Sequence, residues 1–152
     1  METEGAYSLI QVTKPQTMAY GLNDSPAGLA AWFIEKYRAW SDCDGNLEKR
    51  FSKDELLTNL MIYWVTETIN SSCRVYYETM HNPTPHPGEK VKVPTAFALL
   101  PRDIQNGPRE WSERSYNVIR WTNLPRGGHF GETEEPQMLA EDIREFFRPL
   151  RQ

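Results

Sequence analysis

The sequence predicts an α/β protein in which a helical half precedes the last part of a parallel sheet. Apolar residues recur at helical spacing in the first half of the 152-residue chain, which is typical of amphipathic helices. From residue 91 onward, strand-like and helix-like runs alternate in the order β-α-β-α, and this order favours parallel strands covered by helices. Only two strand-like runs occur, whereas sheets commonly have about four to six strands. We therefore expect the C-terminal part of a larger α/β fold.

A proline-rich stretch sets the predicted domain boundaries. HNPTPHPG, residues 81–88, contains three prolines and one glycine, which end regular structure. We accordingly expect a helical segment at residues 1–82, a connector at residues 83–90 and part of an α/β core at residues 91–152.

The helical segment is predicted to begin with little regular structure. Residues 1–23 include the polar stretch VTKPQT and predict a loop with one short helix around Met18 to Leu22. Residues 24–40 predict a long helix, because Asp24 or Ser25 can cap its start and Pro26 suits its first turn. The apolar residues of this helix are expected in the core: Leu29, Trp32, Phe33, Tyr37 and Trp40.

Two further helices are predicted before the connector. Ser52 and Glu55 have the spacing of a capping box at the start of a second long helix. Residues 68–80 predict a third helix that ends at the prolines.

The second half is predicted to contain strands at residues 93–100 and 116–124, with a short helix at residues 108–114 between them. A final helix begins at Pro136. Three acidic residues just before it, Glu132, Glu134 and Glu135, suit the positive end of its dipole. A strand as apolar as residues 93–100 should be buried on both faces, yet two parallel strands alone leave edges with unpaired backbone groups.

Composition and charge exclude several classes of partner. The net charge is -4 and the basic residues are scattered, which argues against nucleic acid and polybasic membrane binding. No apolar run reaches the roughly 20 residues of a membrane span, and METEG is acidic where a secretory signal is basic. Cys43 and Cys73 are isolated thiols, which suits a reducing, cytoplasmic location.

Asp103 and His129 are the candidate functional pair. Asp103 comes two residues after VPTAFALLP, and His129 comes five residues after Leu124, behind two glycines that allow a sharp turn. Functional groups gather at the carboxyl ends of parallel strands, so one strand-helix-strand step makes the two side chains neighbours. A carboxylate on the ring fixes the tautomer that a general base needs. Two alternatives remain open: Asp103 caps the short helix, or Glu110 is the acid.

No nucleophile or metal site is recognisable beside this pair. The sequence has no G-x-S-x-G elbow, no Gly-rich phosphate loop and no H-E-x-x-H motif. His81 and His86 flank the connector, but no third ligand has a suitable spacing for a metal. In α/β-hydrolases the chain order is nucleophile, acid, histidine, so a chain that begins inside the lid has the acid and histidine without the nucleophile.

Five long blocks carry a specific resemblance: AYSLIQVTKPQT, LNDSPAGLAAWFIEKYRAWSD, FSKDELLTNLMIYWVTETINSS, KVPTAFALLPRD and RGGHFGETEEPQMLAEDIREFF. In sequence and order they resemble the C-terminal portion of the microsomal-type epoxide hydrolases. The resemblance implies a helical cap followed by the last two parallel strands and final helix of an α/β-hydrolase fold.

The resemblance also implies roles for individual residues. Tyr7 and Tyr76 match the cap tyrosines that donate to the epoxide oxygen, whereas Tyr77 is out of register. Asp103 matches the acid that orients the base, and His129 matches the base that activates water. The family's aspartate nucleophile matches no residue here. The implied activity is therefore hydrolysis of a small epoxide to a vicinal diol through an alkyl-enzyme ester, in detoxification, without cofactor, once the nucleophile-bearing N-terminal half is supplied.

Two other readings of the chain stay open. Esterases and haloalkane dehalogenases share the Asp-His logic but have no use for two tyrosines on a leaving oxygen. Alternatively, the chain is a catalytically inactive fragment that acts as an interaction or oligomerisation module, because open strand edges favour self-association into a homo-oligomer.

Overall fold

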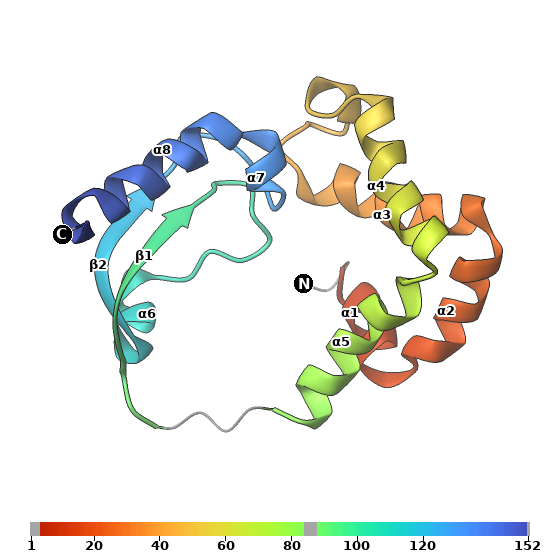
Figure 1. Cartoon of the computed structure of the whole chain (residues 1–152), viewed down its shortest axis with the longest axis horizontal. Helices are drawn as coiled ribbons and strands as arrows, with labels where there is room; N and C mark the ends of the chain where they lie inside the picture. Colours follow the sequence, from red (N-terminus) through yellow and green to blue (C-terminus); the bar gives the residue numbers. More distant parts are fainter. Residues whose placement is uncertain (1–3, 84–87, 152) are drawn as a thin grey trace. The chain divides into compact units, whose positions relative to one another are not determined.

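The computed structural model describes residues 4–83 and 88–151, which form two units by their contacts. The helical unit comes from Met1–Glu35 and Ser52–His86, and the sheet unit from Lys36–Phe51 and Pro87–Gln152. The helices and strands are labelled in Figure 1. Residues 36–51 thus pack with the second half of the chain, a detail that the boundaries predicted from the prolines do not include.

The helical unit begins with two helices, α1 (Gly5–Thr13) and α2 (Pro15–Asp24). The short helix expected around Met18 to Leu22 lies within α2, whereas the loop predicted before it is wrong over the described residues. Pro15 occupies the first turn of α2, where its missing N–H is not needed and its fixed φ suits the helix. The proline of VTKPQT consequently marks a junction between two helices and not a loop.

The other predicted helices of this half are confirmed as α3 (Pro26–Trp40), α4 (Lys53–Thr66) and α5 (Ile69–His81). Ser25 caps α3, because its Oγ accepts a hydrogen bond of 3.0 Å from Gly28 N–H. The capping box of α4 is also present: Ser52 N–H donates to Glu55 at 2.8 Å, and Glu55 N–H donates to Ser52 Oγ at 3.2 Å. These hydrogen bonds, led by the one from the Ser52 backbone, lower the pKa of Glu55.

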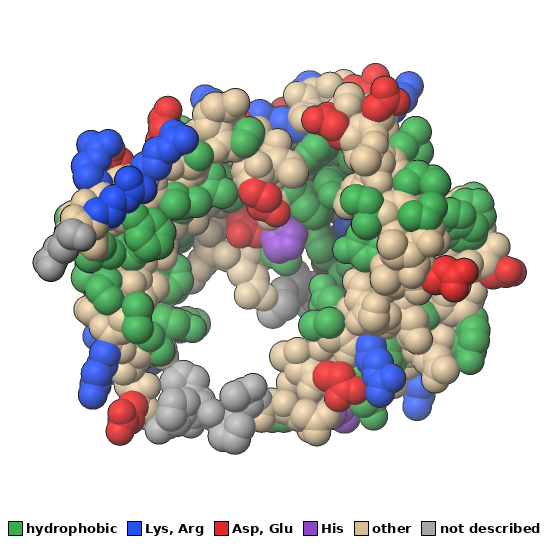
Figure 2. Space-filling view, viewed as in Figure 1, with side chains coloured by type: hydrophobic (Ala, Val, Ile, Leu, Met, Phe, Trp, Pro, Cys, Tyr) green, Lys and Arg blue, Asp and Glu red, His purple; other side chains and the backbone are tan. Residues whose placement is uncertain are grey.

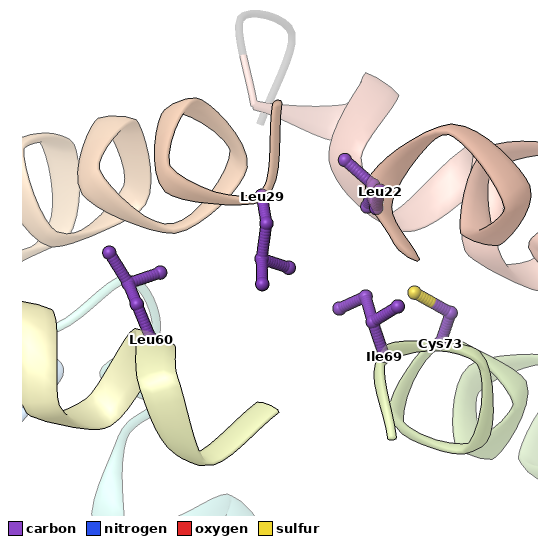
Figure 3. Packing of buried hydrophobic residues seen from close by; sticks show 5 residues of the cluster. All are labelled: Leu22, Leu29, Leu60, Ile69 and Cys73. Atoms are coloured by element: carbon purple, nitrogen blue, oxygen red, sulfur yellow. The ribbon is translucent and has the colours of Figure 1, made fainter. Parts of the chain in front are cut away.

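The core of the helical unit lies between α2, α3, α4 and α5 (Figure 3). One or two buried side chains from each helix meet there: Leu22, Leu29, Leu60, Ile69 and Cys73. Trp32 and Phe33 of α3 are half-buried and pack against this cluster, as predicted for the aromatic face of that helix. Removal of this apolar surface from water is the main favourable term that holds the helices together.

The sheet unit contains the predicted β-α-β-α order. β1 (Val91–Leu99) is followed by α6 (Arg109–Ser115), β2 (Tyr116–Asn123), the short α7 (Gly131–Glu134) and α8 (Pro136–Phe147). Short 3-10 helices occur at Leu47–Lys49 and Arg148–Leu150. β1 and β2 pair in parallel, with Thr95 opposite Val118 and Leu99 opposite Asn123. The parallel arrangement confirms the predicted α/β class.

The apolar strand is not buried on both faces in this unit. Residues 91–94 of β1 are exposed and residues 95–99 are only half-buried, because the described strands form a two-stranded sheet. Val93 is 68% exposed and Ile119 of β2 is 49% exposed. Figure 2 shows hydrophobic side chains reaching the surface over these strands. The expectation of two-sided burial is therefore wrong for this chain by itself.

The helices offer no membrane span: across residues 4–83 and 88–151, none combines the length and the apolarity that crossing a membrane demands.

Candidate active site

Asp103 and His129 meet in the sheet unit. His129 Nδ1 lies 2.8 Å from Asp103 Oδ1, and the two side chains are 38% and 30% exposed. Asp103 follows β1, and His129 follows β2, so the parallel pairing brings both to the carboxyl ends of the strands. A bridge between Arg102 and Gly128 joins the two loops beyond the last paired strand residues.

The hydrogen bond defines what the imidazole can do. An ionised aspartate only accepts hydrogen bonds, so Nδ1 carries the proton in this pair. A neutral ring then has its lone pair on Nε2, which can take a proton from a bound molecule. The carboxylate also favours the imidazolium that such a transfer produces.

The alternative assignments for the acid find less support. Asp103 Oδ1 accepts from the next backbone N–H, that of Ile104, at 2.7 Å. The N-cap position of α6 is occupied by Pro108, without a side-chain cap, so Asp103 does not cap that helix. Glu110 lies in the first turn of α6, and the carboxylate bound to His129 is that of Asp103.

The two glycines before His129 are required by the backbone. Gly127 has φ of 105°, which residues with a side chain rarely adopt. A Cβ on Gly128 would lie 2.5 Å from Trp40 O and 2.8 Å from Asp42 N. The sharp turn predicted for this pair is therefore present, and its reason is close backbone packing against residues 40–42.

Aromatic rings surround the histidine. The Trp40 and Phe130 rings lie edge-on to the His129 ring, each with centroids 5.3 Å away. Phe130 in turn stacks on Tyr37 at 4.1 Å. These contacts restrict the orientation of the imidazole. Trp40 and Tyr37 were predicted only as core residues of a helix, because their sequence distance from His129 gives no signal of this contact.

An ion network holds the start of the histidine loop. Glu135 is buried and accepts from Arg126 at 2.7 Å and from Arg50 at 2.9 Å. The hydrogen bond from Arg126 is the main cause that lowers the pKa of Glu135, and it raises the pKa of Arg126. Arg50 also binds Asp42, 3.2 Å from its side chain. Sequence reasoning assigned Glu135 only to a helix dipole and missed this network.

Tyr7 and Tyr76 are neighbours in the helical unit. Tyr7 of α1 and Tyr76 of α5 have ring centroids 6.0 Å apart in an edge-on arrangement. The Tyr7 ring also stacks on Trp32 of α3 at 4.7 Å. Burial raises the pKa of the Tyr7 phenol well above its usual value, and the nearby Tyr76 raises it further. Tyr7 is therefore held as a neutral hydrogen-bond donor.

Tyr77 takes a different direction from Tyr76. Its ring stacks on His81 with centroids 4.0 Å apart, and it lines a pocket with residues 13–17, Asn70 and Arg74. His81 lies at the end of α5, while His86 is outside the described residues. The described part of the chain contains no group of three or more side chains placed to hold a metal.

No family model matches this chain. Epoxide hydrolase 1 of Sus scrofa is 45% identical over 98% of this chain, and juvenile hormone epoxide hydrolase 2 of Ctenocephalides felis is 43% identical over 92%. The chain spans only 35% and 32% of the length of these two relatives.

Two solved structures are similar over 95% of the chain. The juvenile hormone epoxide hydrolase of the silkworm Bombyx mori matches with a TM-score of 0.85 and 34% identity, and 39% of that structure is covered. The epoxide hydrolase of Aspergillus niger matches with a TM-score of 0.81 and 30% identity, and 35% of it is covered.

Proposed function

Because this chain corresponds to the C-terminal part of epoxide hydrolases with the α/β-hydrolase fold, we propose that it carries their cap tyrosines, orienting acid and general base. The observation that supports this best is the 2.8 Å hydrogen bond between His129 and Asp103. The proposed reaction is hydrolysis of a small epoxide to a vicinal diol, with the nucleophile contributed by an N-terminal half.

The proposed role of His129 is in the hydrolytic step. Once a nucleophilic carboxylate has opened the epoxide, the product is held as an ester. His129 Nε2 takes a proton from water as the water oxygen attacks the ester carbonyl. The ester C–O bond then breaks, the diol oxygen takes the proton from the imidazolium, and the carboxylic acid formed ionises to regenerate the nucleophilic carboxylate. Asp103 stabilises the imidazolium formed meanwhile.

The proposed role of Tyr7 and Tyr76 is in the ring-opening step. When the C–O bond breaks, negative charge develops on the epoxide oxygen, and a phenol can give it a hydrogen bond or a proton. The raised pKa of Tyr7 keeps that proton in place until a far more basic alkoxide develops. A pair of phenols favours an epoxide over the haloalkanes of related hydrolases, because a haloalkane has no leaving oxygen to stabilise.

A chimera tests this proposal directly. The 152-residue chain would be joined to the N-terminal two thirds of the Sus scrofa relative, and hydrolysis of styrene oxide would be followed by diol formation and intact mass. We expect the chain alone to be inactive and the chimera to form diol. His129→Gln should slow diol release by about 10²–10⁴-fold while a substrate-sized ester adduct accumulates.

The tyrosines have a distinct signature in the same assay. Tyr7→Phe or Tyr76→Phe should slow adduct formation, because each removes a donor to the epoxide oxygen, whereas Tyr77→Phe is the matched control. Diol release at the wild-type rate by both Tyr7→Phe and His129→Gln chimeras would refute the assigned roles. Epoxide turnover by the isolated chain would refute the need for a separate nucleophile.

The exposed strands support self-association as a second candidate function. Val93 and Ile119 are 68% and 49% exposed on a sheet of two described strands, and open strand edges readily pair with another chain. We propose that the isolated chain forms homo-oligomers through this sheet. Light scattering after size exclusion tests it: a monomer across micromolar concentrations would rule it out.

The cellular setting is also a proposal. Cys43 and Cys73 are both buried free thiols, which suits a reducing compartment. We propose epoxide detoxification in the cytoplasm, which cell fractionation with an antibody to the chain would test.

A further inference from the structure

The loop that carries His129 has an acceptor for each of four consecutive backbone N–H groups. Gly127 donates to Asp42 Oδ2 at 3.0 Å, and His129 donates to Trp40 O at 2.9 Å. Gly128 and Phe130 both donate to Glu134, at 3.0 Å to Oε2 and 3.1 Å to Oε1. A single carboxylate therefore binds the backbone on both sides of the histidine.

Glu134 also joins this loop to a distant part of the chain. Its Oε2 accepts from Asp42 N–H at 2.7 Å, across 92 residues of sequence. The residue is only 8% exposed, so these three hydrogen bonds replace the water that an ionised carboxylate needs. All the residues concerned belong to the sheet unit.

We propose that Glu134 is the positioning residue for His129: it fixes the loop backbone so that the imidazole meets Asp103. The catalytic meaning of this placement rests on the proposed function, but the placement itself does not. The His129–Asp103 distance of 2.8 Å leaves little tolerance, because a hydrogen bond of this kind weakens beyond about 3.2 Å. A backbone shift of about 0.5 Å is enough to exceed that limit.

The competing explanation is that Glu134 merely places negative charge near the start of α8. Glu132 lies two residues earlier in the same short helix, is exposed, and has the same charge. A dipole effect should therefore be similar for both residues, whereas positioning should depend on Glu134. Glu135 supplies a third comparison, because its carboxylate is buried but binds Arg50 and Arg126.

Glutamine at position 134 is a sharp perturbation. An amide has one acceptor oxygen and one donor NH₂ in place of two acceptor oxygens. If its oxygen serves Gly128 and Asp42, its NH₂ faces the N–H of Phe130, and two donors repel. If the amide is flipped, the repulsion falls on Gly128 and Asp42. Either orientation therefore disturbs a backbone hydrogen bond next to His129, at Phe130 or at Gly128. The flipped orientation also disturbs the bond to Asp42, in the segment that packs on the loop.

The test is the tautomer of His129 in the 152-residue chain, without substrate. Long-range proton-nitrogen NMR spectra of chain labelled with ¹⁵N-histidine distinguish Nδ1–H from Nε2–H at a pH where the ring is neutral. His129→Gln assigns the signal among the three histidines. We expect the wild type to show the Nδ1–H form, and Asp103→Asn to return toward the mixture of free histidine.

Glu134→Gln should likewise lose the Nδ1–H form, whereas Glu132→Gln should keep it. Glu135→Gln should lower the urea midpoint and still show the Nδ1–H form of His129. This variant therefore separates positioning from general stability. A wild-type tautomer in folded Glu134→Gln would overturn the proposal.

A second measurement covers the case in which Glu134→Gln does not fold. In the wild-type chain the amides of Gly128 and Phe130 should exchange with solvent slowly, because both are bound to a buried carboxylate. Fast exchange at both would overturn the proposal. Neither readout uses an epoxide, so an inactive chimera would refute the proposed function and leave the positioning result standing.

Discussion

Gly128→Ala tests how closely the histidine loop is fixed to residues 40–42. The added Cβ would lie 2.5 Å from Trp40 O, 2.8 Å from Asp42 N and 2.8 Å from Ser41 Cα, whereas ordinary contact begins at 3.4 Å. All three neighbours are backbone atoms, so no side-chain rotation relieves the clash. The loop must therefore move away by about 0.9 Å, the deficit at Trp40 O.

This displacement can be converted into two expected results. If it reaches the ring in full, the 2.8 Å separation of His129 and Asp103 grows to roughly 3.7 Å, beyond hydrogen-bond range. Overpacking of this kind costs about 1–3 kcal/mol, and the strained bond from His129 N–H to Trp40 O adds about 1 kcal/mol. We expect a loss of about 2–4 kcal/mol in the free energy of unfolding.

Urea denaturation followed by tryptophan fluorescence measures the first effect, and the His129 tautomer measures the second. With a slope of about 2 kcal/mol per molar urea, the middle of the range for small proteins, the midpoint should fall by roughly 1–2 M. Gly107→Ala is the matched control, because a Cβ there has no atom within 4 Å. A Gly128→Ala variant within about 0.5 kcal/mol of the wild type, with an unchanged tautomer, would refute the close-packing argument.

Three further predictions concern single ionisable groups. The hydrogen bond from Arg126 is the main cause that lowers the pKa of Glu135 in the folded chain. The contribution of Glu135 to stability is therefore present above the pKa of unfolded glutamate, about 4.3, and is lost as pH falls through the lower pKa of the folded state. The gap in urea midpoint between wild type and Glu135→Gln should therefore narrow on acidification from pH 7, and a gap that does not change with pH would contradict this. Burial raises the pKa of the Cys73 thiol to about 11. Peptide mapping should therefore show that alkylation of Cys73 at pH 8 is roughly 100-fold slower in the native chain than in urea. Equal rates would mean that α5 does not pack as described. Because the pKa of Tyr7 is raised by burial, Tyr7→Phe should leave the absorbance change of tyrosine ionisation near pH 10 unaltered; a reduced amplitude there would show that Tyr7 is exposed.

Local signals in the sequence predicted most of the elements. The capping box of Ser52 and Glu55 and the cap at Ser25 act within a few residues, so the helix starts were readable. The neighbourhood of Asp103 and His129 followed from topology, because the carboxyl ends of adjacent parallel strands meet. The family resemblance then supplied the tyrosines, which periodicity alone would leave as core residues.

The remaining features depend on long-range contacts and could not be read from the sequence. Glu134 and Asp42 are 92 residues apart, and a glutamate before a helix is equally typical of a dipole interaction. The stacking of Tyr7 on Trp32 joins α1 and α3. Periodicity shows that each helix has an apolar face, but it does not show against which other helix that face packs. Pro15 misled for a different reason, since a proline that is typical of a loop here occupies the first turn of α2, directly after Lys14, which caps both α1 and α2.

In the sheet unit, the His129–Asp103 pair is in place although the strands before it are partly exposed. The loop that carries His129 is held by the segment from Trp40 to Asp42 and by Glu134, all within the unit. Its strands, in contrast, remain exposed at Val93 and Ile119. Formation of the His129–Asp103 hydrogen bond therefore needs no further strand, whereas burial of β1 does. On this reasoning, joining the N-terminal part of a relative should raise the urea midpoint strongly and leave the His129 tautomer unchanged. A tautomer that becomes fixed only in the chimera would show instead that the pair is organised by the completed sheet.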